Sequence, residues 1–141
     1  MRILMVCLGN ICRSPMAEAV LRALRPDWTV DSAGTGHWHR GEPPDERALA
    51  ELARHGLRTT HRARQVTAED YRRFDRLLAM DRQVLAELER RRPRDATARL
   101  ELFDRQDVPD PYYEGPEAFA AVYEQIARRC RELAEESRCA P

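Results

Sequence analysis

The chain has 141 residues, with 24 basic and 24 acidic side chains and a formal net charge of zero. All 24 of the basic residues are arginine, and charged residues make up 34% of the chain against 43% apolar residues. This balance predicts one globular domain with one core, spanning residues 1–141. The lack of a net basic charge argues against nucleic acid or an anionic membrane as the main partner.

The four cysteines are Cys7, Cys12, Cys130 and Cys139, too few and too unevenly placed for a disulfide framework. They include no Cys-x-x-Cys pair, with which a structural zinc site usually begins. The apolar run at the N-terminus ends at Leu8, which is too short for a secretory signal. No apolar stretch approaches the roughly 20 residues needed to cross a bilayer. We therefore expect a cytoplasmic protein with reduced cysteines.

The first part of the chain predicts two strands with a helix between them. Residues 2–6 are apolar throughout, which is typical of a strand buried on both faces. A helix begins at Ser14-Pro15, where proline costs no hydrogen bond, and ends before Pro26. Residues 28–31 predict the second strand. The helix positions expected to face the core are Met16, Ala19, Val20, Ala23 and Leu24.

Two further helices are expected before the third strand. The first begins near residues 43–45 and ends at Gly56, where a C-terminal glycine belongs. Its inward positions are Ala48, Leu49, Leu52 and Ala53. The second is short and is indicated by Thr67-x-x-Asp70, a capping signal.

The second half of the chain repeats the alternation of strand and helix. Residues 76–80 predict a buried strand, after which Asp81 can cap a helix that ends before Pro93. Residues 99–103 alternate as a fourth strand, and a loop over residues 104–115 leads into the last helix. The apolar stripe of that helix comprises Phe119, Val122, Tyr123, Ile126, Cys130 and Leu133.

Strand–helix alternation repeated four times predicts an α/β fold, a four-stranded parallel sheet with helices on both faces. In such a sheet, ligands bind beyond the carboxyl ends of the strands, near the point where the strand order reverses. We therefore expect the functional residues in the loops that follow the first and fourth strands.

The loop after the first strand reads Cys7-Leu8-Gly9-Asn10-Ile11-Cys12-Arg13-Ser14. A cysteine followed six residues later by arginine is easily met by chance in so arginine-rich a chain. Its context makes it informative, because the cysteine ends a buried strand and a helix starts at once. Backbone N–H groups ahead of a helix converge on one point and favour an anion there.

Arg13 adds a planar fork that can pair with two oxygens of a phosphate-like group. The same positive field favours thiolate over thiol at Cys7, which makes it a nucleophile, and Ser14 can donate a hydrogen bond to it. The alternative interpretation makes Cys7 a buried strand end and Arg13 a solvated cation.

In the loop after the fourth strand, Asp110 lies between Pro109 and Pro111, so its backbone is stiff. A carboxylic acid there could protonate a leaving oxygen and then accept a proton from attacking water. The adjacent Tyr112 and Tyr113 could line a pocket for a flat ring. Taken alone, this segment is more typical of a surface turn with two half-buried tyrosines.

Together these motifs resemble those of the low-molecular-weight protein tyrosine phosphatase family. The loop over residues 7–14 is similar to that family's phosphate-binding loop, and Asp110-Pro111-Tyr112-Tyr113 to its acid loop. Further matches are Asp31-Ser32-Ala33-Gly34, His61-Arg62-Ala63-Arg64-Gln65 and Ala79-Met80-Asp81. The resemblance covers essentially the whole chain and implies a flavodoxin-like, three-layer fold of the phosphotyrosine phosphatase I type.

The resemblance implies that Cys7 attacks the phosphorus of an aryl phosphate, Arg13 stabilises the transferring group and Asp110 protonates the leaving phenolate. The resulting cysteinyl-phosphate is hydrolysed by water, and neither a metal nor another cofactor is needed. The phosphate would be bound by residues 8–14, which include Leu8, Gly9 and Ile11.

Three supporting roles are also implied by the resemblance. Asn10, Ser14, Ser32 and His61 would hold the shape of the loop. Trp38, Tyr112 and Tyr113 would border the entrance for the phosphotyrosine ring. Cys12 would form a reversible disulfide with Cys7 that protects the nucleophile from overoxidation.

The remaining candidates are cysteines, histidines and arginines outside these motifs. We expect Cys130 to be packed in the core and Cys139 to be exposed near the terminus. His37-x-His39 lacks a third metal ligand. Partner choice would depend on the loop around Trp38 and on three rim arginines, Arg40, Arg62 and Arg64.

The resemblance implies as substrate a phosphotyrosine-containing protein or a small aryl phosphate. Phosphate-like oxyanions would inhibit, and a tyrosine kinase is a candidate opposing enzyme. We expect a bacterial source. One alternative is an arsenate reductase on the same scaffold, which needs two more cysteines to relay oxidation. The other is a non-catalytic oxyanion-binding regulator, which would be expected to lack Cys7, Arg13 or Asp110.

Overall fold

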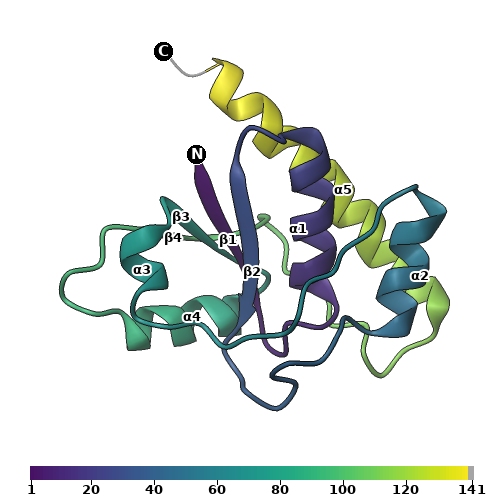
Figure 1. The fold of residues 1–141 in the computed structure, drawn as a ribbon, viewed down its shortest axis with the longest axis horizontal. Coiled ribbons are helices and arrows are strands. Elements are labelled where there is room, and N and C mark those ends of the chain that lie inside the picture. Colours follow the sequence, from purple (N-terminus) through teal and green to yellow (C-terminus); the bar gives the residue numbers. More distant parts are fainter. Residues whose placement is uncertain (140–141) are drawn as a thin grey trace.

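A computed structural model describes the backbone of residues 1–139 and the side chains of residues 1–136. Within this part of the chain, parallel strands form a four-stranded sheet in the order β2-β1-β3-β4 (Figure 1). The strands are β1 (Arg2–Cys7), β2 (Thr29–Gly34), β3 (Arg76–Ala79) and β4 (Arg99–Leu102). The helices are α1 (Arg13–Leu24), α2 (Glu46–Arg54), α3 (Asp70–Arg73), α4 (Arg82–Arg91) and α5 (Pro116–Cys139).

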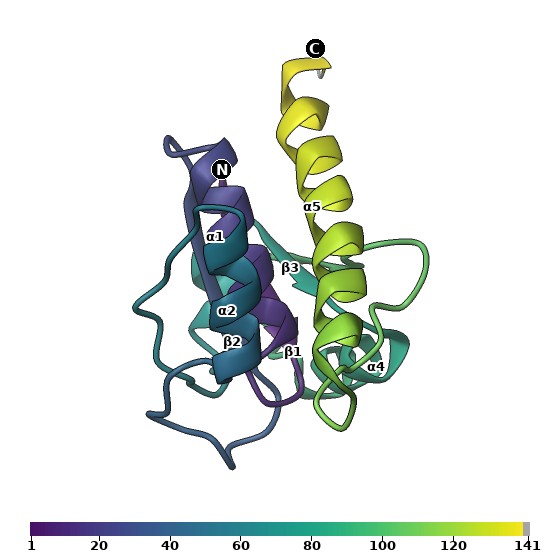
Figure 2. The same cartoon turned by 90° about the vertical axis from the view of Figure 1, so that its right-hand side faces the viewer.

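Helices cover both faces of the sheet, as the alternation predicts. On one face α1 packs against α5 and α2, and Figure 2 shows α5 running beside α1. On the other face α3 and α4 pack over β3 and β4, with Tyr71, Phe74 and Leu88 in a second apolar cluster. The central strand β1 is buried from Ile3 to Cys7 because both layers press on it. None of the helices in the described part of the chain is long and apolar enough to span a membrane.

Two predicted helix faces are wrong in detail. Ala23 and Leu24 of α1 are exposed, and the buried positions of that helix include Leu21 instead. Ala53 of α2 is also exposed, whereas the charged Glu51 is buried and paired with Arg54 and His55. In both helices the neighbouring layer covers a face slightly rotated from the one that the apolar pattern indicates.

The second strand is longer than predicted because residues 32–34 continue it beside β1. The polar Ser32 interrupts the apolar pattern, yet it is completely buried. Gly34 ends β2 where the chain passes close to the loop after β1. A Cβ on Gly34 would lie 2.7 Å from the carbonyl oxygen of Leu8, so only glycine fits this position.

The strand order reverses at β1, whose neighbours are β2 on one side and β3 on the other. The loop after β1 therefore starts at the switch point of the sheet, where open α/β sheets form their binding crevice. The loop after β2 reaches the same end of the molecule (Figure 1). The fold thus brings these two loops to one edge, with Cys7 as the last residue of β1.

Candidate active site

The Cys7 sulfur lies at the base of the loop over residues 7–14 and is almost completely buried. Its Sγ is 2.9 Å from the Ser14 Oγ and accepts a hydrogen bond from the Asn10 N–H at 3.2 Å. The helix α1 that follows has neither a side-chain cap nor an acidic residue in its first turn. Its N-terminus therefore keeps a positive field directed at the loop, which stabilises an anion there.

Arg13 connects this loop to two other parts of the fold. Its guanidinium is buried, and Nη1 donates to the Asp81 carboxylate at 2.7 Å and to the Val108 carbonyl at 2.9 Å. Nη2 lies 3.8 Å from Asp110 Oδ2. Burial acts to lower the pKa of Arg13, but the Cys7 sulfur and the two carboxylates outweigh it and raise that pKa above its ordinary value. The side chain is thus a fixed cation beside the nucleophile.

Asp81 therefore performs two tasks. Its Oδ1 accepts from the Val84 N–H at 2.8 Å, which confirms the predicted cap of α4. Its Oδ2 orients Arg13, and nothing in the local sequence indicates this contact.

Asp110 lies in the loop between β4 and α5, with its side chain 42% exposed. Its Oδ1 accepts a hydrogen bond from the Tyr112 N–H at 3.1 Å, which leaves Oδ2 on the side of Arg13. The two flanking prolines restrict the backbone, so the carboxylate is held without regular secondary structure.

These groups meet in a pocket of about 450 Å³. Its lining residues are Cys7, Leu8, Gly9, Asn10, Ile11, Cys12, Arg13, Trp38, His39, Asp110, Tyr112 and Tyr113. The pocket thus combines a polar loop at Cys7 with aromatic walls, and the rings of Tyr112 and Tyr113 pack edge to face at 4.9 Å. Such a pocket suits a flat ring that carries an anionic group at one end.

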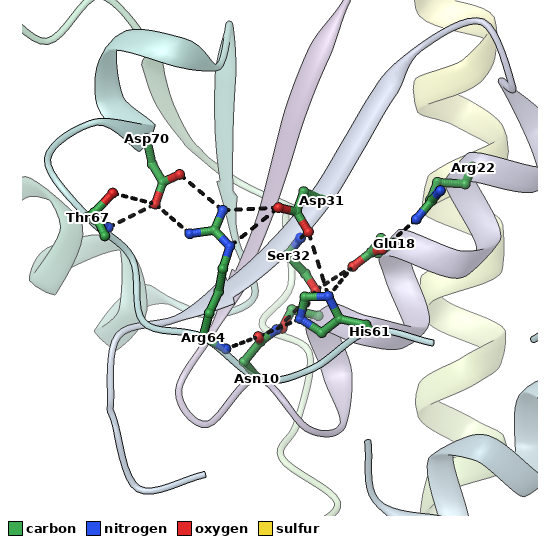
Figure 3. Close-up of polar contacts among 10 residues, drawn as sticks. Asn10, Glu18, Arg22, Asp31, Ser32, His61, Arg64, Thr67 and Asp70 are labelled. Atoms are coloured by element: carbon green, nitrogen blue, oxygen red, sulfur yellow. Dashed lines mark hydrogen bonds and ion pairs between the residues drawn. The ribbon is translucent and has the colours of Figure 1, made fainter. Parts of the chain in front are cut away.

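Asn10 is the centre of the hydrogen bonds that support the loop (Figure 3). Its backbone is left-handed, with φ of 60°, a conformation that asparagine tolerates better than most residues. The side-chain Nδ2 donates to Ser14 Oγ at 2.8 Å and to Ser32 Oγ at 3.0 Å. The Oδ1 accepts from His61 Nε2 at 2.7 Å and from the Arg64 N–H at 3.0 Å. The structure thus brings together the four residues expected to support the loop.

Comparisons with known proteins agree with this geometry. A family model described as "Low molecular weight phosphotyrosine protein phosphatase" matches residues 2–139. The curated relative of that name from Sus scrofa is 43% identical, with 96% of this chain and 95% of the relative covered. The one from Schizosaccharomyces pombe is 42% identical, with 89% of each covered.

The chain belongs to the low molecular weight phosphotyrosine protein phosphatase family. Solved structures agree with this assignment. DARP, a Drosophila arginine phosphatase, has a TM-score of 0.94 at 35% identity and covers all of both chains. Vibrio vulnificus Wzb, solved in complex with benzylphosphonate, has a TM-score of 0.89 at 32% identity and covers 95% of this chain and 97% of that chain. The predicted family, fold and enzyme class, a phosphotyrosine phosphatase, are confirmed.

In this phosphatase a second group of contacts surrounds His61. Its Nδ1 lies 3.2 Å from Glu18 Oε1 and 3.6 Å from Asp31 Oδ1. Ser32 Oγ donates to the same Glu18 oxygen at 2.6 Å. Among the described residues, the ligand atoms of Glu18, Asp31 and His61 lie within 4.8 Å of one another, as a metal site would require. Hydrogen bonds within the loop support already engage all three side chains, and these contacts account for the cluster.

The expectation that Arg64 borders the entrance is wrong. Its guanidinium donates to Asp70 at 2.9 and 3.0 Å and to Asp31 at 3.1 and 3.3 Å (Figure 3). Burial acts to lower the pKa of Arg64, but Asp70 and Asp31 outweigh it and raise that pKa. Arg40 and Arg62 are exposed, but neither lines the pocket. Arg64 thus belongs to the support of the phosphatase loop.

The cysteines differ in their surroundings. Cys7, Cys12 and Cys130 are free thiols. Burial raises the pKa of Cys12 far above its ordinary value, and the charges of Asp45 and Cys7 add to the shift. Cys130 is buried as predicted, with its sulfur 3.7 Å from the Ala17 carbonyl. The expectation for the Cys139 side chain falls outside the described residues.

Proposed function

We propose that Cys7, Arg13 and Asp110 carry out the metal-independent hydrolysis of phosphotyrosine and related aryl phosphates. The supporting observation is that all three side chains line one aromatic pocket, with the Cys7 sulfur hydrogen-bonded at the N-terminus of α1. Residues 8–14 bind the phosphate oxygens through their N–H groups, and the Arg13 fork adds charge-assisted hydrogen bonds. Phosphate-like oxyanions are inhibitors because they occupy the same positions.

The reaction has two steps. The Cys7 sulfur attacks phosphorus, the P–S bond forms and the P–O bond to the aryl group breaks. Asp110, in its acid form, gives its proton to the leaving phenolate oxygen. Water then attacks the cysteinyl-phosphate, Asp110 accepts a proton from this water, and the P–S bond breaks to release inorganic phosphate and the thiolate.

Trp38, Tyr112 and Tyr113 accept the phenyl ring of the substrate. All three line the pocket, and the Tyr112 backbone is tied to α2 because Arg47 Nη2 donates to its carbonyl at 2.9 Å. A phosphoserine side chain has no ring that could pack against these aromatic side chains. The pocket therefore favours aryl over alkyl phosphates.

A regulatory role for Cys12 is also proposed. A peroxide oxidises the Cys7 thiolate to a sulfenic acid and is itself reduced to water or an alcohol. The Cys12 thiol then attacks that sulfur, the disulfide forms and water leaves. Since burial raises the pKa of Cys12, Cys7 is the first of the two to be oxidised.

The test compares the wild type with Cys7→Ser in steady-state hydrolysis of p-nitrophenyl phosphate, phosphotyrosine, phosphoserine and phosphoarginine, and in thiol-dependent reduction of arsenate. We expect turnover of the two aryl phosphates by the wild type and none by the variant, which still binds vanadate or phosphate. Turnover retained by Cys7→Ser would overturn the mechanism. Faster thiol-dependent reduction of arsenate would favour the reductase, and binding without turnover by the wild type would favour the regulator.

The arsenate reductase needs further cysteines that can reach the site. Cys130 is completely buried between α5 and α1, which argues against it as a relay. A cytoplasmic location, a bacterial source and an opposing tyrosine kinase remain parts of this proposal. The solved structures similar to this chain include Escherichia coli Wzb, whereas the curated relatives described above are from an animal and a yeast.

A further inference from the structure

The indole of Trp38 stands between two concavities. One is the pocket over Cys7. The other is a groove of about 490 Å³. It shares Leu8, Arg13, Trp38 and Asp110 with the pocket, and its remaining lining residues come from the loop after β2, Gln65, Asp81 and one face of α4. Trp38 is 62% exposed and stacks on the His37 ring at 5.7 Å. A side chain that borders both concavities can decide which part of a substrate enters each.

The position of this indole depends on Gly36. A Cβ on Gly36 would lie 1.4 Å from Trp38 Cζ3 and 2.1 Å from Cε3, so any larger residue would displace the ring. The backbone of this segment is fixed, because the N–H groups of Thr35 and Gly36 donate to the carbonyls of Cys7 and Leu8 at 3.0 and 2.9 Å. The ring therefore rests on a rigid backbone that is hydrogen-bonded to the phosphate-binding loop.

The charges in the groove are already paired. Asp81 is held by Arg13, and Glu87 forms ion pairs with Arg90 and Arg91. Gln83 is exposed at the start of α4, and its side-chain amide makes no hydrogen bond with the part of the chain that the structure describes. A groove with paired charges and an available amide suits an uncharged, hydrogen-bonding ligand, such as an extended peptide backbone.

We propose that this groove binds the polypeptide segment next to the phosphotyrosine, and that Gly36 is a positioning residue that holds Trp38 as the partition between ring and polypeptide. The inference rests on the proposed function, since a phosphotyrosine in the pocket places its backbone at the mouth beside Trp38. The shared edge of the two concavities then leads the chain past Gln83. The substrate class is thus a phosphotyrosine in an extended, accessible segment of a protein.

The first test places a larger side chain in the groove and leaves the lining residues of the pocket over Cys7 unchanged. Gln83→Arg is compared with Ala86→Arg, which adds the same charge to an exposed position of α4 outside the groove. The substrates are free phosphotyrosine and a short phosphopeptide with serine and glycine on both sides. We expect Gln83→Arg to raise the ratio of the peptide KM to the free phosphotyrosine KM about fivefold, the effect of roughly 1 kcal/mol. Ala86→Arg should leave this ratio unchanged.

An unchanged KM ratio in Gln83→Arg, or an equal rise of this ratio in Ala86→Arg, would overturn the proposal that the groove binds the polypeptide. Failure of the proposed function is a separate outcome, because the wild type would then hydrolyse neither substrate.

The second test concerns Gly36. Gly36→Ala should raise KM for free phosphotyrosine more than it lowers kcat, because the ring wall moves while Cys7, Arg13 and Asp110 stay in place. In a Trp28→Phe background Trp38 is the one remaining tryptophan, and Gly36→Ala should then change its fluorescence emission and its quenching by acrylamide. In a Trp38→Ala background Gly36→Ala should have no further effect on KM. An effect that persists there, or an unchanged fluorescence, would overturn the role of Gly36.

Discussion

The carboxylate of Asp70 lies at the far end of the contacts that support Asn10, and its replacement tests whether they matter. The Asp70 side chain is 3% exposed and accepts from both terminal nitrogens of Arg64 and from the Thr67 N–H at 2.8 Å. The Thr67 hydroxyl donates to it as well, at 3.3 Å. In Asp70→Asn the single amide oxygen cannot replace all four acceptor contacts, and the amide NH2 group would face N–H donors with which it cannot form a hydrogen bond. Arg64 would then lose one of its two carboxylates.

The expected loss follows from this geometry. Breaking a buried ion pair costs about 3–5 kcal/mol. Arg64 keeps Asp31 and is 30% exposed, so solvent and the second carboxylate reduce the loss to about 2 kcal/mol. For a chain of this length that corresponds to a fall in Tm of roughly 4–8 °C. Because the Arg64 N–H also holds Asn10, we expect kcat at a temperature well below Tm to fall about tenfold.

Thermal unfolding followed by circular dichroism and p-nitrophenyl phosphate turnover measure both effects. The matched control is Asp95→Asn, which removes an exposed carboxylate paired with Arg72 at 3.1 Å. This exposed pair should contribute at most about 1 kcal/mol and leave kcat unchanged. If Asp70→Asn loses no more stability than Asp95→Asn, the buried pair is not a stabilising contact. If Asp70→Asn loses stability but keeps the kcat of the wild type, the Asp70–Arg64 pair does not position the loop over residues 7–14.

Three further predictions concern the acid, the second cysteine and acid stability. Asp110→Asn should slow kcat by about 10²–10⁴-fold for phenyl phosphate and much less for esters with better leaving groups, and an equal loss across leaving groups would contradict the acid role. Cys12→Ala should still lose activity in peroxide but recover less of it with dithiothreitol than the wild type, and equal recovery would exclude the disulfide. Arg90 and Arg91 lower the pKa of Glu87 to about 2 from 4.5, so its ion pairs stabilise the fold above pH 4.5 and are lost as the pH falls through 2. Glu87→Gln should therefore flatten the pH dependence of unfolding in urea over that window, and an unchanged slope would contradict the assignment.

Local signals in the sequence predict most of the fold. The uniformly apolar residues 2–6 allow one interpretation, a strand covered on both faces, and Ser14-Pro15 begins a helix within one residue of its observed start. The second strand was predicted too short, because Ser32 is buried through hydrogen bonds that an apolar pattern does not detect. The strand order β2-β1-β3-β4 comes from the tertiary structure. It puts the switch point of the sheet at β1 and so places the loop after β1 in the binding crevice.

The residues of the candidate site also fall into two groups, those that local sequence signals identify and those that only the fold brings into the site. Cys7, Arg13 and Asp110 can be found from the sequence because each lies in a short segment marked by a glycine, by prolines or by the start of a helix. Asp81, Glu18 and Asp70 were missed as members of the site because each resembles an ordinary cap, surface or turn carboxylate in its own segment.

The 24 arginines show what the sequence by itself determined and what only the tertiary structure decided. The sequence distinguishes Arg13 from the others, because it lies six positions after a cysteine that ends a buried strand. It assigns Arg64 to the surface, whereas the fold turns that side chain toward Asp31 and Asp70 and makes it part of the loop support. The physical reason is the distance along the chain. Arg13 and Cys7 belong to one short loop, whose shape local residues determine. The contact of Asp81 with Arg13 joins residues 68 positions apart and that of Arg64 with Asn10 joins residues 54 positions apart, and only the packed sheet brings such residues together.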